Sequence, residues 1–222
     1  MDTKKKELIG NFANAGRTWR REAPEVNAHD FPQDAKDRAV PYGLYDVGRE
    51  RGHVRVGISG DTPRFAVEAI AHWWETEGRQ TYPGCGDMLL LADAGGSNSC
   101  RARAWKFELQ RRLADGLGLR VTVCHYPTGA SKWNPVEHRF FGPISINWMG
   151  EPFTSLGKML NLIRGTQGAP ATASLDRRRY PVGEKVSAEQ MRDLNLTRAR
   201  VCPNWNYTLS PRRDAHNLDS GP

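Results

Sequence analysis

The 222-residue sequence has few cysteines and no long apolar run. Its four cysteines, at positions 85, 100, 124 and 202, lie far apart and form no C-x-x-C pair. This spacing argues against a zinc ribbon or a disulfide framework and fits a reducing cytoplasm. No apolar run reaches the roughly eighteen residues of a membrane span, and the basic start "MDTKKKELIG" has no apolar core behind it. We therefore expect a cytoplasmic protein with neither a membrane span nor a secretory signal.

Acidic residues are outnumbered by basic ones. The chain holds 32 Lys plus Arg against 25 Asp plus Glu, which gives a formal net charge of +7. Such a balance favours a polyanionic partner, because each phosphate that is neutralised releases condensed counterions. A solvated basic surface kept for solubility would give the same composition. The charge favours nucleic acid but does not identify it.

The apolar pattern predicts a mixed α/β fold. Residues 52–60 alternate in the manner of a strand buried on one face, and residues 43–48 would be the hairpin partner. Strands are also expected at 3–12 and 119–126, and within 87–99, where a short apolar strand leads into a glycine-rich turn. Helices are expected at 61–78 (with Asp61 as the N-cap), 100–115 and 154–165. A helix between two apolar strands is typical of a parallel crossover with both sheet faces covered. We predict a three-layer domain over residues 1–165, with 13–43 as a long loop or insertion.

The last part of the chain has a different composition. Residues 166–222 carry basic clusters, a short helix that begins in a Ser187–Gln190 capping box, and a possible closing strand at 203–213. We predict a basic C-terminal extension. Its arginines could contact phosphates or form a solvated tail: Arg177, Arg178, Arg179, Arg198, Arg200, Arg212 and Arg213.

Asp93 follows the apolar run "MLLLA" directly. In open α/β sheets, functional groups gather beyond the carboxyl ends of the strands. An Asp before Gly95 and Gly96 is also a common turn former. Position alone leaves both interpretations open.

Glu137 lies in "HYPTGASKWNPVEHRFF", residues 125–141. Asn134, Pro135 and Glu137 read as N-cap, N1 and N3 of a helix, and such a capping box would account for Glu137 without any chemistry. The loop nevertheless leaves the strand at 119–126, which is expected to neighbour the Asp93 strand. Both carboxylates could therefore face one crevice.

Asp2 lies at the head of the first predicted strand, where a chain terminus is ordinarily frayed. Three carboxylates from separate elements can hold two divalent cations about 3.5–4 Å apart. Oxygen ligands are what Mg²⁺ or Mn²⁺ require. Such a pair activates a water or a 3′-hydroxyl and stabilises the leaving oxygen of an in-line displacement.

Longer stretches carry a resemblance to a known family. "DTKKKELIGNF", "LLLADAGGSNSCRARAWKFELQRRLADGLGL", "CHYPTGASKWNPVEHRFF" and, near the end, "LDRRRYPVGEKVS" and "VCPNWNYT" resemble the catalytic domain of DDE transposases of the ISAzo insertion-sequence group. The resemblance runs over almost the whole chain. It implies a ribonuclease H-like fold and metal-dependent DNA cleavage and strand transfer with two Mg²⁺ or Mn²⁺ ions. It also implies DNA partners (element ends and target), a homo-oligomer on DNA and a nucleoid location.

The same resemblance assigns residues. The catalytic and metal-binding triad becomes Asp2, Asp93 and Glu137, with forty-three residues between the last two. Asn98 would steady the Asp93 turn. The residues that the resemblance and the basic clusters offer as DNA contacts or supports are Lys132, Asn134, His138, Arg101, Arg103, Arg178 and Arg179. Asp46 and Asp61 compete with Asp2, but a hairpin turn and a helix cap are expected to account for them.

The front of the sequence departs from the family pattern. Members carry a helix-turn-helix region before the catalytic domain and apolar residues before the first Asp, whereas only Met1 precedes Asp2 here. We therefore expect an N-terminally truncated transposase. A catalytically inactive DNA-binding remnant is the alternative, and a ribonuclease H-like nuclease with host duties is less compatible with the text at 125–141 and 180–208. Trp133 is expected to pack under the active-site loop rather than to stack on a base.

Overall fold

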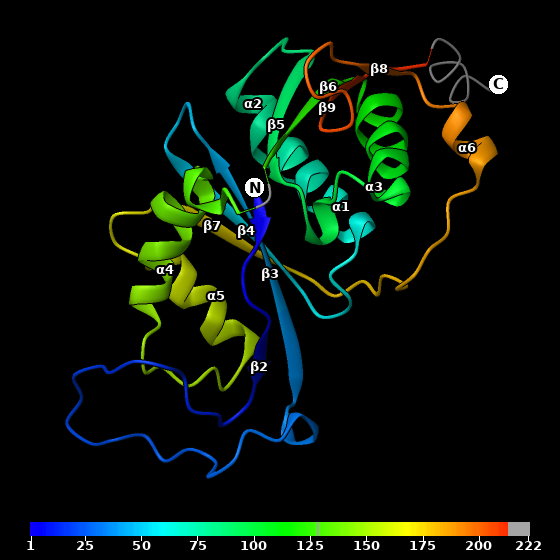
Figure 1. Cartoon of the computed structure of the whole chain (residues 1–222). Coiled ribbons are helices and arrows are strands. Elements are labelled where there is room, and N and C mark those ends of the chain that lie inside the picture. The colour runs from blue at the N-terminus through cyan, green and yellow to red at the C-terminus, as the bar shows by residue number, and fades with distance from the viewer. Residues whose placement is uncertain (128, 213–222) are drawn as a thin grey trace, which may run out of the picture. The chain divides into compact units, whose positions relative to one another are not determined.

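The computed structural model describes residues 1–127 and 129–212, and these fall into two units (Figure 1). The β3–β4 unit comprises Asp2–Gly60 and Pro135–Arg179. The β5–β6 unit comprises Met1, Asp61–Asn134 and the chain from Tyr180 on. Each unit holds one sheet and its own helices. Arg213 and the rest of the predicted extension beyond it lie outside the described residues.

The sheet of the β3–β4 unit is built around a long hairpin. β3 (Asp37–Asp46) pairs antiparallel with β4 (Arg51–Gly57), and β1 (Asp2–Thr3) and β2 (Glu7–Ile9) both pair antiparallel with β3. The predicted strand and its hairpin partner are confirmed. β3 starts at Asp37, earlier than the sequence predicted, because its buried run from Ala39 to Leu44 continues the ladder.

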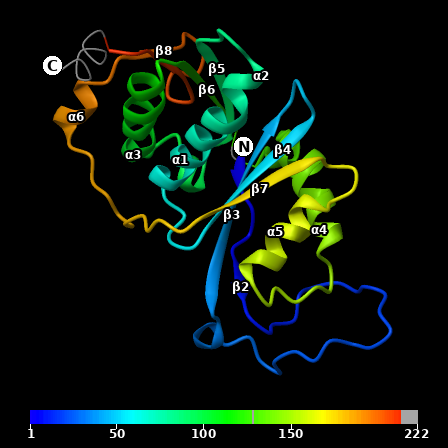
Figure 2. The ribbon, with the colours of Figure 1, turned by 180° about the vertical axis from the view of Figure 1, so that it is seen from behind.

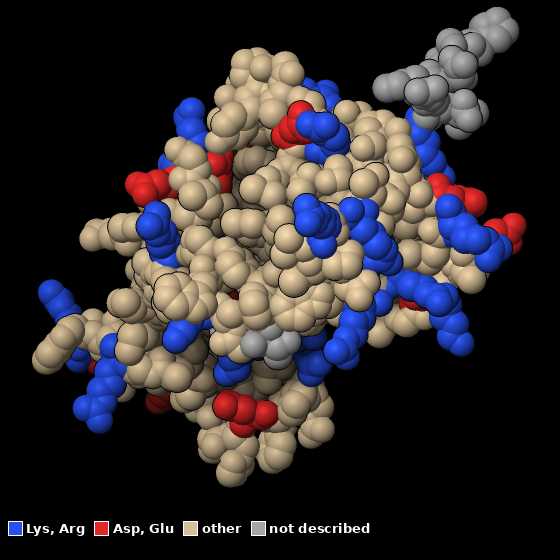
Figure 3. Space-filling model, turned by 45° about the horizontal axis from the view of Figure 1, so that its top comes forward, with Lys and Arg blue, Asp and Glu red and all other residues tan. Residues whose placement is uncertain are grey.

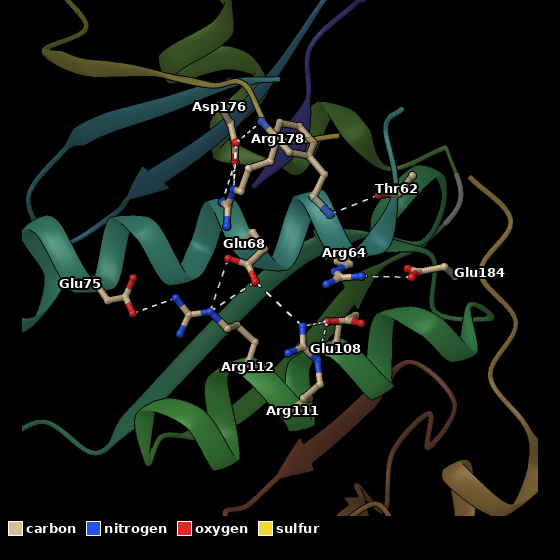
Figure 4. A network of polar contacts seen from close by, with 11 residues as sticks. Thr62, Arg64, Glu68, Glu75, Glu108, Arg111, Arg112, Asp176, Arg178 and Glu184 are labelled. Carbon is tan, nitrogen blue, oxygen red and sulfur yellow. Dashed lines mark hydrogen bonds and ion pairs between the residues drawn. The ribbon is translucent and has the colours of Figure 1, made fainter. Parts of the chain in front are cut away.

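The fifth strand of this sheet was not predicted. β7 (Ala171–Asp176) pairs in parallel with β4 along six residue pairs. Its small and polar residues, "ATASLD", lack the apolar alternation that marks a strand. At its end, the buried carboxylate of Asp176 accepts hydrogen bonds from Arg178 (Figure 4). The guanidinium of Arg55 on β4 lies 3.5 Å from the same carboxylate. This cluster closes the end of the β4–β7 pair.

Helices cover the β3–β4 unit on one side of its sheet (Figure 2). η6 (Val136–Phe141), with π-helical hydrogen bonding, continues into α4 (Gly142–Asn147), and α5 (Leu156–Arg164) lies beside α4. The Ser155 side chain caps α5 by accepting from the Lys158 amide at 3.1 Å. The predicted helix at 154–165 is thus confirmed. Its apolar stripe is buried against the sheet together with the rings of Phe140 and Phe141.

Two glycines let η6 approach the strands closely. A Cβ at Gly43 on β3 would collide with the ring of Phe141, and one at Gly52 on β4 would collide with the ring of Phe140. Both rings are buried. Since a strand glycine often marks a close approach of another element, these positions fix η6 directly over the β3–β4 hairpin.

The β5–β6 unit has a four-stranded sheet in the order β5-β6-β9-β8. β5 (Asp87–Asp93) and β6 (Arg120–Tyr126) are parallel, as predicted for a helical crossover. β9 (Asn206–Leu209) pairs antiparallel with β6, and β8 (Leu196–Arg198) pairs with β9. The predicted closing strand is confirmed, while β8 was not predicted.

Two helical segments pack side by side on this sheet (Figure 1). α1 (Pro63–Trp73) runs on through the π-helical turn η2 (Trp74–Gly78) into α2 (Arg79–Thr81). α3 (Arg103–Glu108) runs on into η4 (Leu109–Asp115). The cap of α1 is Thr62, whose hydroxyl accepts from the Phe65 amide at 3.2 Å, so the prediction of Asp61 as N-cap is wrong. Pro63 directly after Thr62 favours the helix start at this position.

A partly exposed ion network joins these two helical segments (Figure 4). Glu68 on α1 lies 3.4 Å from Arg112, which also donates to Glu75 at 2.8 Å. Arg111 donates to Glu108 at 2.7 Å. Only the carboxylates of Glu68 and Glu108 are largely buried, and each has a basic partner, which burial of a charge requires.

The remaining helical turns are short. α6 (Ala188–Arg192) begins in the predicted capping box, in which the Ser187 hydroxyl accepts from the Gln190 amide and the Gln190 side chain accepts from the Ser187 amide. Single 3-10 turns form η1 (Pro32–Asp34), η3 (Gly96–Asn98) and η5 (Ser131–Trp133). The predicted mixed α/β class is confirmed, with the strands divided between two sheets instead of joined in the one central sheet that was expected.

Candidate functional site

Asp93 is the last residue of β5, and the chain turns sharply after it. Gly96 has a φ of +62°, a conformation that favours glycine, and opens the 3-10 turn η3. The side chains of Ser97 and Asn98 are buried in this turn, and the Cys100 amide donates to the Ala94 carbonyl. The turn is therefore packed and hydrogen-bonded, and it holds Asp93 at the carboxyl end of the strand.

One oxygen of the Asp93 carboxylate is buried and unsatisfied among the described residues. Among the described residues, its buried Oδ1 atom has no hydrogen-bond partner. A buried acceptor without a partner costs free energy, so a cation or a donor at this atom would stabilise it. The turn-forming role of Asp93 does not account for this buried oxygen without a partner.

Asp93 affects the pKa values of His125 and Tyr126 on the neighbouring strand. The Nδ1 atom of His125 lies 2.9 Å from the Asp93 carbonyl oxygen and its Nε2 atom 3.3 Å from the Tyr207 hydroxyl. Burial lowers the pKa of His125, and the contact with the Asp93 carbonyl opposes the shift. Burial and the Asp93 charge both raise the pKa of Tyr126. His125 was not singled out as a site residue from the sequence, although it lies opposite the strand-terminal Ala92–Asp93 pair.

Glu137 lies in the first turn of a helix. The π-helical part η6 begins at Val136, and Pro135 before it already belongs to the helix. The predicted helix start is confirmed, because Pro135 is the first residue in helical conformation (φ −58°, ψ −28°) and Asn134 directly precedes it. Glu137 is half-buried. The helix start therefore accounts for the position of Glu137, and it is compatible with a chemical role.

Asp2 lies on the sheet face that η6 covers. Asp2 pairs directly with Gly43 on β3, and directly paired residues of antiparallel strands share a face. A Cβ at Gly43 points at the Phe141 ring, and Glu137 lies one turn before Phe141 on η6. The β3–β4 unit thus places Asp2 and Glu137 on one face of its sheet. Asp2 is fixed in a ladder, and its Oδ1 atom accepts from the Thr3 amide at 2.7 Å.

Lys4 is a third charged group on this face. Residues two apart along a strand share a face, and the Lys4 amide extends the ladder by donating to the Pro41 carbonyl. The Lys4 ammonium donates to the Ser145 hydroxyl at 2.6 Å and lies 4.9 Å from the centre of the Trp148 ring. Burial lowers its pKa, while the carboxylates of Glu7 and Glu137 act in the opposite direction. Sequence reasoning missed Lys4, although its spacing from Asp2 was a usable signal.

The proposed triad is divided between the two units, since Asp93 belongs to the β5–β6 unit and Asp2 and Glu137 to the other. Within residues 1–127 and 129–212, no three His, Cys, Asp or Glu residues are grouped closely enough to hold a metal ion. The individual donors still fit a hard divalent cation, because they are carboxylate oxygens and Asp93 Oδ1 has no other partner in the described chain.

Asp46 and Asp61, which compete with Asp2 as the first metal ligand, differ in whether a structural role accounts for them. Asp46 accepts from the amides of Gly48 and Arg49 at 3.0 and 3.2 Å, which is the predicted hairpin-turn role. Asp61 is not the cap of α1, so that role does not account for it. Asp61 belongs to the unit of Asp93.

The residues proposed to contact DNA differ in exposure. Lys132, His138, Arg101, Arg103 and Arg179 are exposed, whereas Asn134 is buried at 1% exposure. The guanidinium of Arg178 is held by Asp176 at 2.7 Å. Arg103 and Lys185 line a hollow of about 460 Å³ in the β5–β6 unit. Figure 3 shows Lys and Arg side chains at many points of one face.

Trp133 does not pack as the sequence analysis expected. It is 69% exposed, and the Lys132 ammonium lies 5.3 Å from the centre of its ring. An exposed indole beside a cation presents both a stacking surface and a charge. Local spacing around Trp133 does not distinguish this exposed arrangement from burial.

The comparisons with known proteins bear on the whole chain. The profile of a family described as "Rhodopirellula transposase DDE domain" matches residues 1–211. Nothing matches in the comparison with curated proteins, and nothing matches in that with solved structures. In the part of the chain that the structure describes, no helix is long and apolar enough to cross a membrane.

Proposed function

The chain belongs to the Rhodopirellula transposase DDE domain family, and we propose from this that it catalyses metal-dependent cleavage and strand transfer of the DNA of an insertion sequence. The observation that carries the proposal is Asp93, a strand-terminal carboxylate whose buried Oδ1 has no hydrogen-bond partner in the described chain. DNA is the partner that the family implies. The proposal includes a ribonuclease H-like arrangement, a homo-oligomer assembled on DNA and a location on the nucleoid.

Asp2, Asp93 and Glu137 are the proposed ligands of two Mg²⁺ or Mn²⁺ ions. Their oxygen donors suit such ions. Bound together, the two ions supply an activated water or 3′-hydroxyl and stabilise the leaving oxygen of an in-line displacement. The protein's part is to hold the three carboxylates: the β1 ladder holds Asp2, the turn after β5 holds Asp93, and the packed helix η6 holds Glu137.

Exposed cations would position the DNA. Lys132, Arg101 and Arg103 in the β5–β6 unit, and Arg179 in the other, carry the charge that phosphates attract, and the exposed His138 would add a polar contact. Arg178 would contribute with what its ion pair to Asp176 leaves free, and the buried Asn134 would support the loop before η6. These contacts orient the DNA backbone without reading its sequence.

The test is a cleavage and joining assay on the purified chain with element-end DNA and Mg²⁺ or Mn²⁺. We expect nicks and joined products that are lost in Asp93→Asn and Glu137→Gln. Asp87→Asn is the matched control, because Asp87 lies at the opposite end of β5, exposed and paired with Arg120. Activity that survives in Asp93→Asn would contradict the proposal.

The first ligand can be identified in the same assay. Asp2→Asn should abolish both steps, whereas Asp61→Asn and Asp46→Asn should leave the products intact. Loss in Asp61→Asn with retention in Asp2→Asn would transfer that role to Asp61. DNA binding without products in the unchanged chain would favour the alternative of a non-catalytic DNA-binding remnant.

A further inference from the structure

The Lys4 side chain joins the strand of Asp2 to the helix of Glu137. Its ammonium donates to the Ser145 hydroxyl at 2.6 Å, and that hydroxyl donates to the Phe141 carbonyl at 2.8 Å. Lys4 starts from the β1 edge of the sheet, while Ser145 and Phe141 belong to α4 and η6. A continuous chain of hydrogen bonds therefore runs from the strand to the last turn of η6.

Two aromatic rings enclose the same ammonium. It lies 4.9 Å from the centre of the Trp148 ring and 5.8 Å from that of Phe141, both within the range of cation–π attraction. Trp148 and Phe141 are buried, and Lys4 itself is half-buried. A long flexible side chain held by a charged hydrogen bond and two rings has lost most of its rotamer freedom, which marks a fixed contact rather than a solvated surface lysine.

The charge of Lys4 faces the carboxylates of this unit. Lys4 is two residues after Asp2 on the same face of the sheet, and it attracts Glu137 and Glu7 electrostatically. Without a counter-charge, Asp2 and Glu137 would repel one another when both are ionised. A fixed ammonium between the two elements offsets that repulsion.

We propose that Lys4 is a positioning residue, whose ammonium holds the Glu137 helix against the Asp2 strand and supplies positive charge beside these carboxylates in the metal-free protein. The role of the two carboxylates as ligands rests on the proposed function. The contact by which Lys4 holds the helix in place is independent of the proposed function. Lys4 acts through Glu137 and is not assigned contact with the reacting atoms.

The experiment is hydrogen exchange of the 136–147 segment in the purified full chain without metal. Lys4→Met should make these amides exchange about five- to tenfold faster, because it removes the charged hydrogen bond and the cation–π contacts. Lys6→Met is the matched control, since Lys6 is an exposed neighbour in the same basic run, and it should leave the segment unchanged. Equal exchange in the two variants would overturn the proposal.

Three further arms separate charge from packing. Lys4→Arg should restore slow exchange, since it keeps the cation. Mn²⁺ should slow exchange more in Lys4→Met than in the unchanged chain, because the ion supplies the missing positive charge. Ser145→Ala keeps the Lys4 charge but removes its hydrogen bond. Its 136–147 amides should therefore exchange faster than those of the unchanged chain both without and with Mn²⁺. If Mn²⁺ protects the unchanged chain but not Lys4→Met, the charge role is wrong. If Mn²⁺ protects neither chain, the metal site of the proposed function fails, and the metal-free comparison alone decides on Lys4.

Discussion

At the scale of single residues, Gly43 and Gly52 determine where Glu137 lies. Each lacks a side chain at a point where a buried ring of η6 rests on the strands. A hydrogen atom in place of a methyl group thus sets the height of the helix above the sheet. The position of an acidic side chain depends here on two residues that have no side chain.

We predict that Gly52→Ala destabilises the chain by about 1–3 kcal/mol, because the new methyl group must displace the buried Phe140 ring. Gly86→Ala is the control, since nothing lies within 4 Å of a Cβ built there. Urea unfolding of both variants gives the difference in unfolding free energy. Equal stability of the two would show that η6 does not rest on Gly52.

Glu7 makes the stability of the β3–β4 unit depend on pH. Burial raises its pKa above the ordinary 4.5, and Lys5 and Lys4 reduce that rise. The folded chain therefore binds this proton more tightly than the unfolded chain. The stabilisation is complete below the unfolded value and is lost as the pH rises through the folded one.

Glu7→Gln removes this titration. From about pH 4 to about pH 7, the unfolding free energy of the variant should fall less than that of the unchanged chain. Thermal unfolding at both pH values measures the two slopes. A variant that loses more stability over this interval would reverse the sign and contradict the burial argument.

At the scale of the elements, the start of α1 depends on Thr62. Thr62→Ala should cost about 1 kcal/mol of unfolding free energy, because the Phe65 amide loses its acceptor. Thr62→Ser keeps the hydroxyl and should retain most of the stability. Chemical denaturation of both variants tests the cap, and equal losses would show that the methyl group, and not the hydroxyl, matters.

The long periodic elements were predictable from the sequence. β4, β5, β6, α1 and α5 carry apolar residues at the spacing of their structures, so local pattern and tertiary packing agree. β7 was missed because its residues are small and polar, and it becomes a strand only through its parallel ladder with β4. The residues of "ATASLD" alone do not indicate that β4 is their partner strand.

The candidate site was predictable in part. The position of Asp93 beyond an apolar strand followed from composition and length. The helix start at Pro135 after Asn134 was predicted too, but the π-helical hydrogen bonding from Val136 on was not, because apolar spacing does not distinguish it from an α-helix. Lys4 was hidden in a run of three lysines, of which burial distinguishes only the first. Tertiary packing decides which of the three lysines is buried, and the local spacing of residues does not predict it.

At the scale of the whole molecule, the excess of basic residues predicts salt-sensitive DNA binding. The net charge is +7. Arg101→Gln, Arg179→Gln and Lys132→Gln should each reduce the slope of log affinity against log salt by about one, since each removes one phosphate contact. Fluorescence anisotropy with duplex DNA over a range of salt measures the slopes. Arg120→Gln is the control, because Arg120 is already paired with Asp87; a change of slope in that variant alone would contradict the assignment.

The interleaved course of the chain has a consequence for its synthesis on the ribosome. β6 ends at Tyr126, but the strand that covers its second edge, β9, starts 80 residues later at Asn206. At about 5–20 residues per second, this edge stays without its partner for about 4–16 s. An uncovered strand edge is a template for pairing with other chains. Each newly made copy therefore passes through an interval in which neighbouring copies on the same messenger can capture it, and a ribosome that stops before Asn206 leaves β6 uncovered.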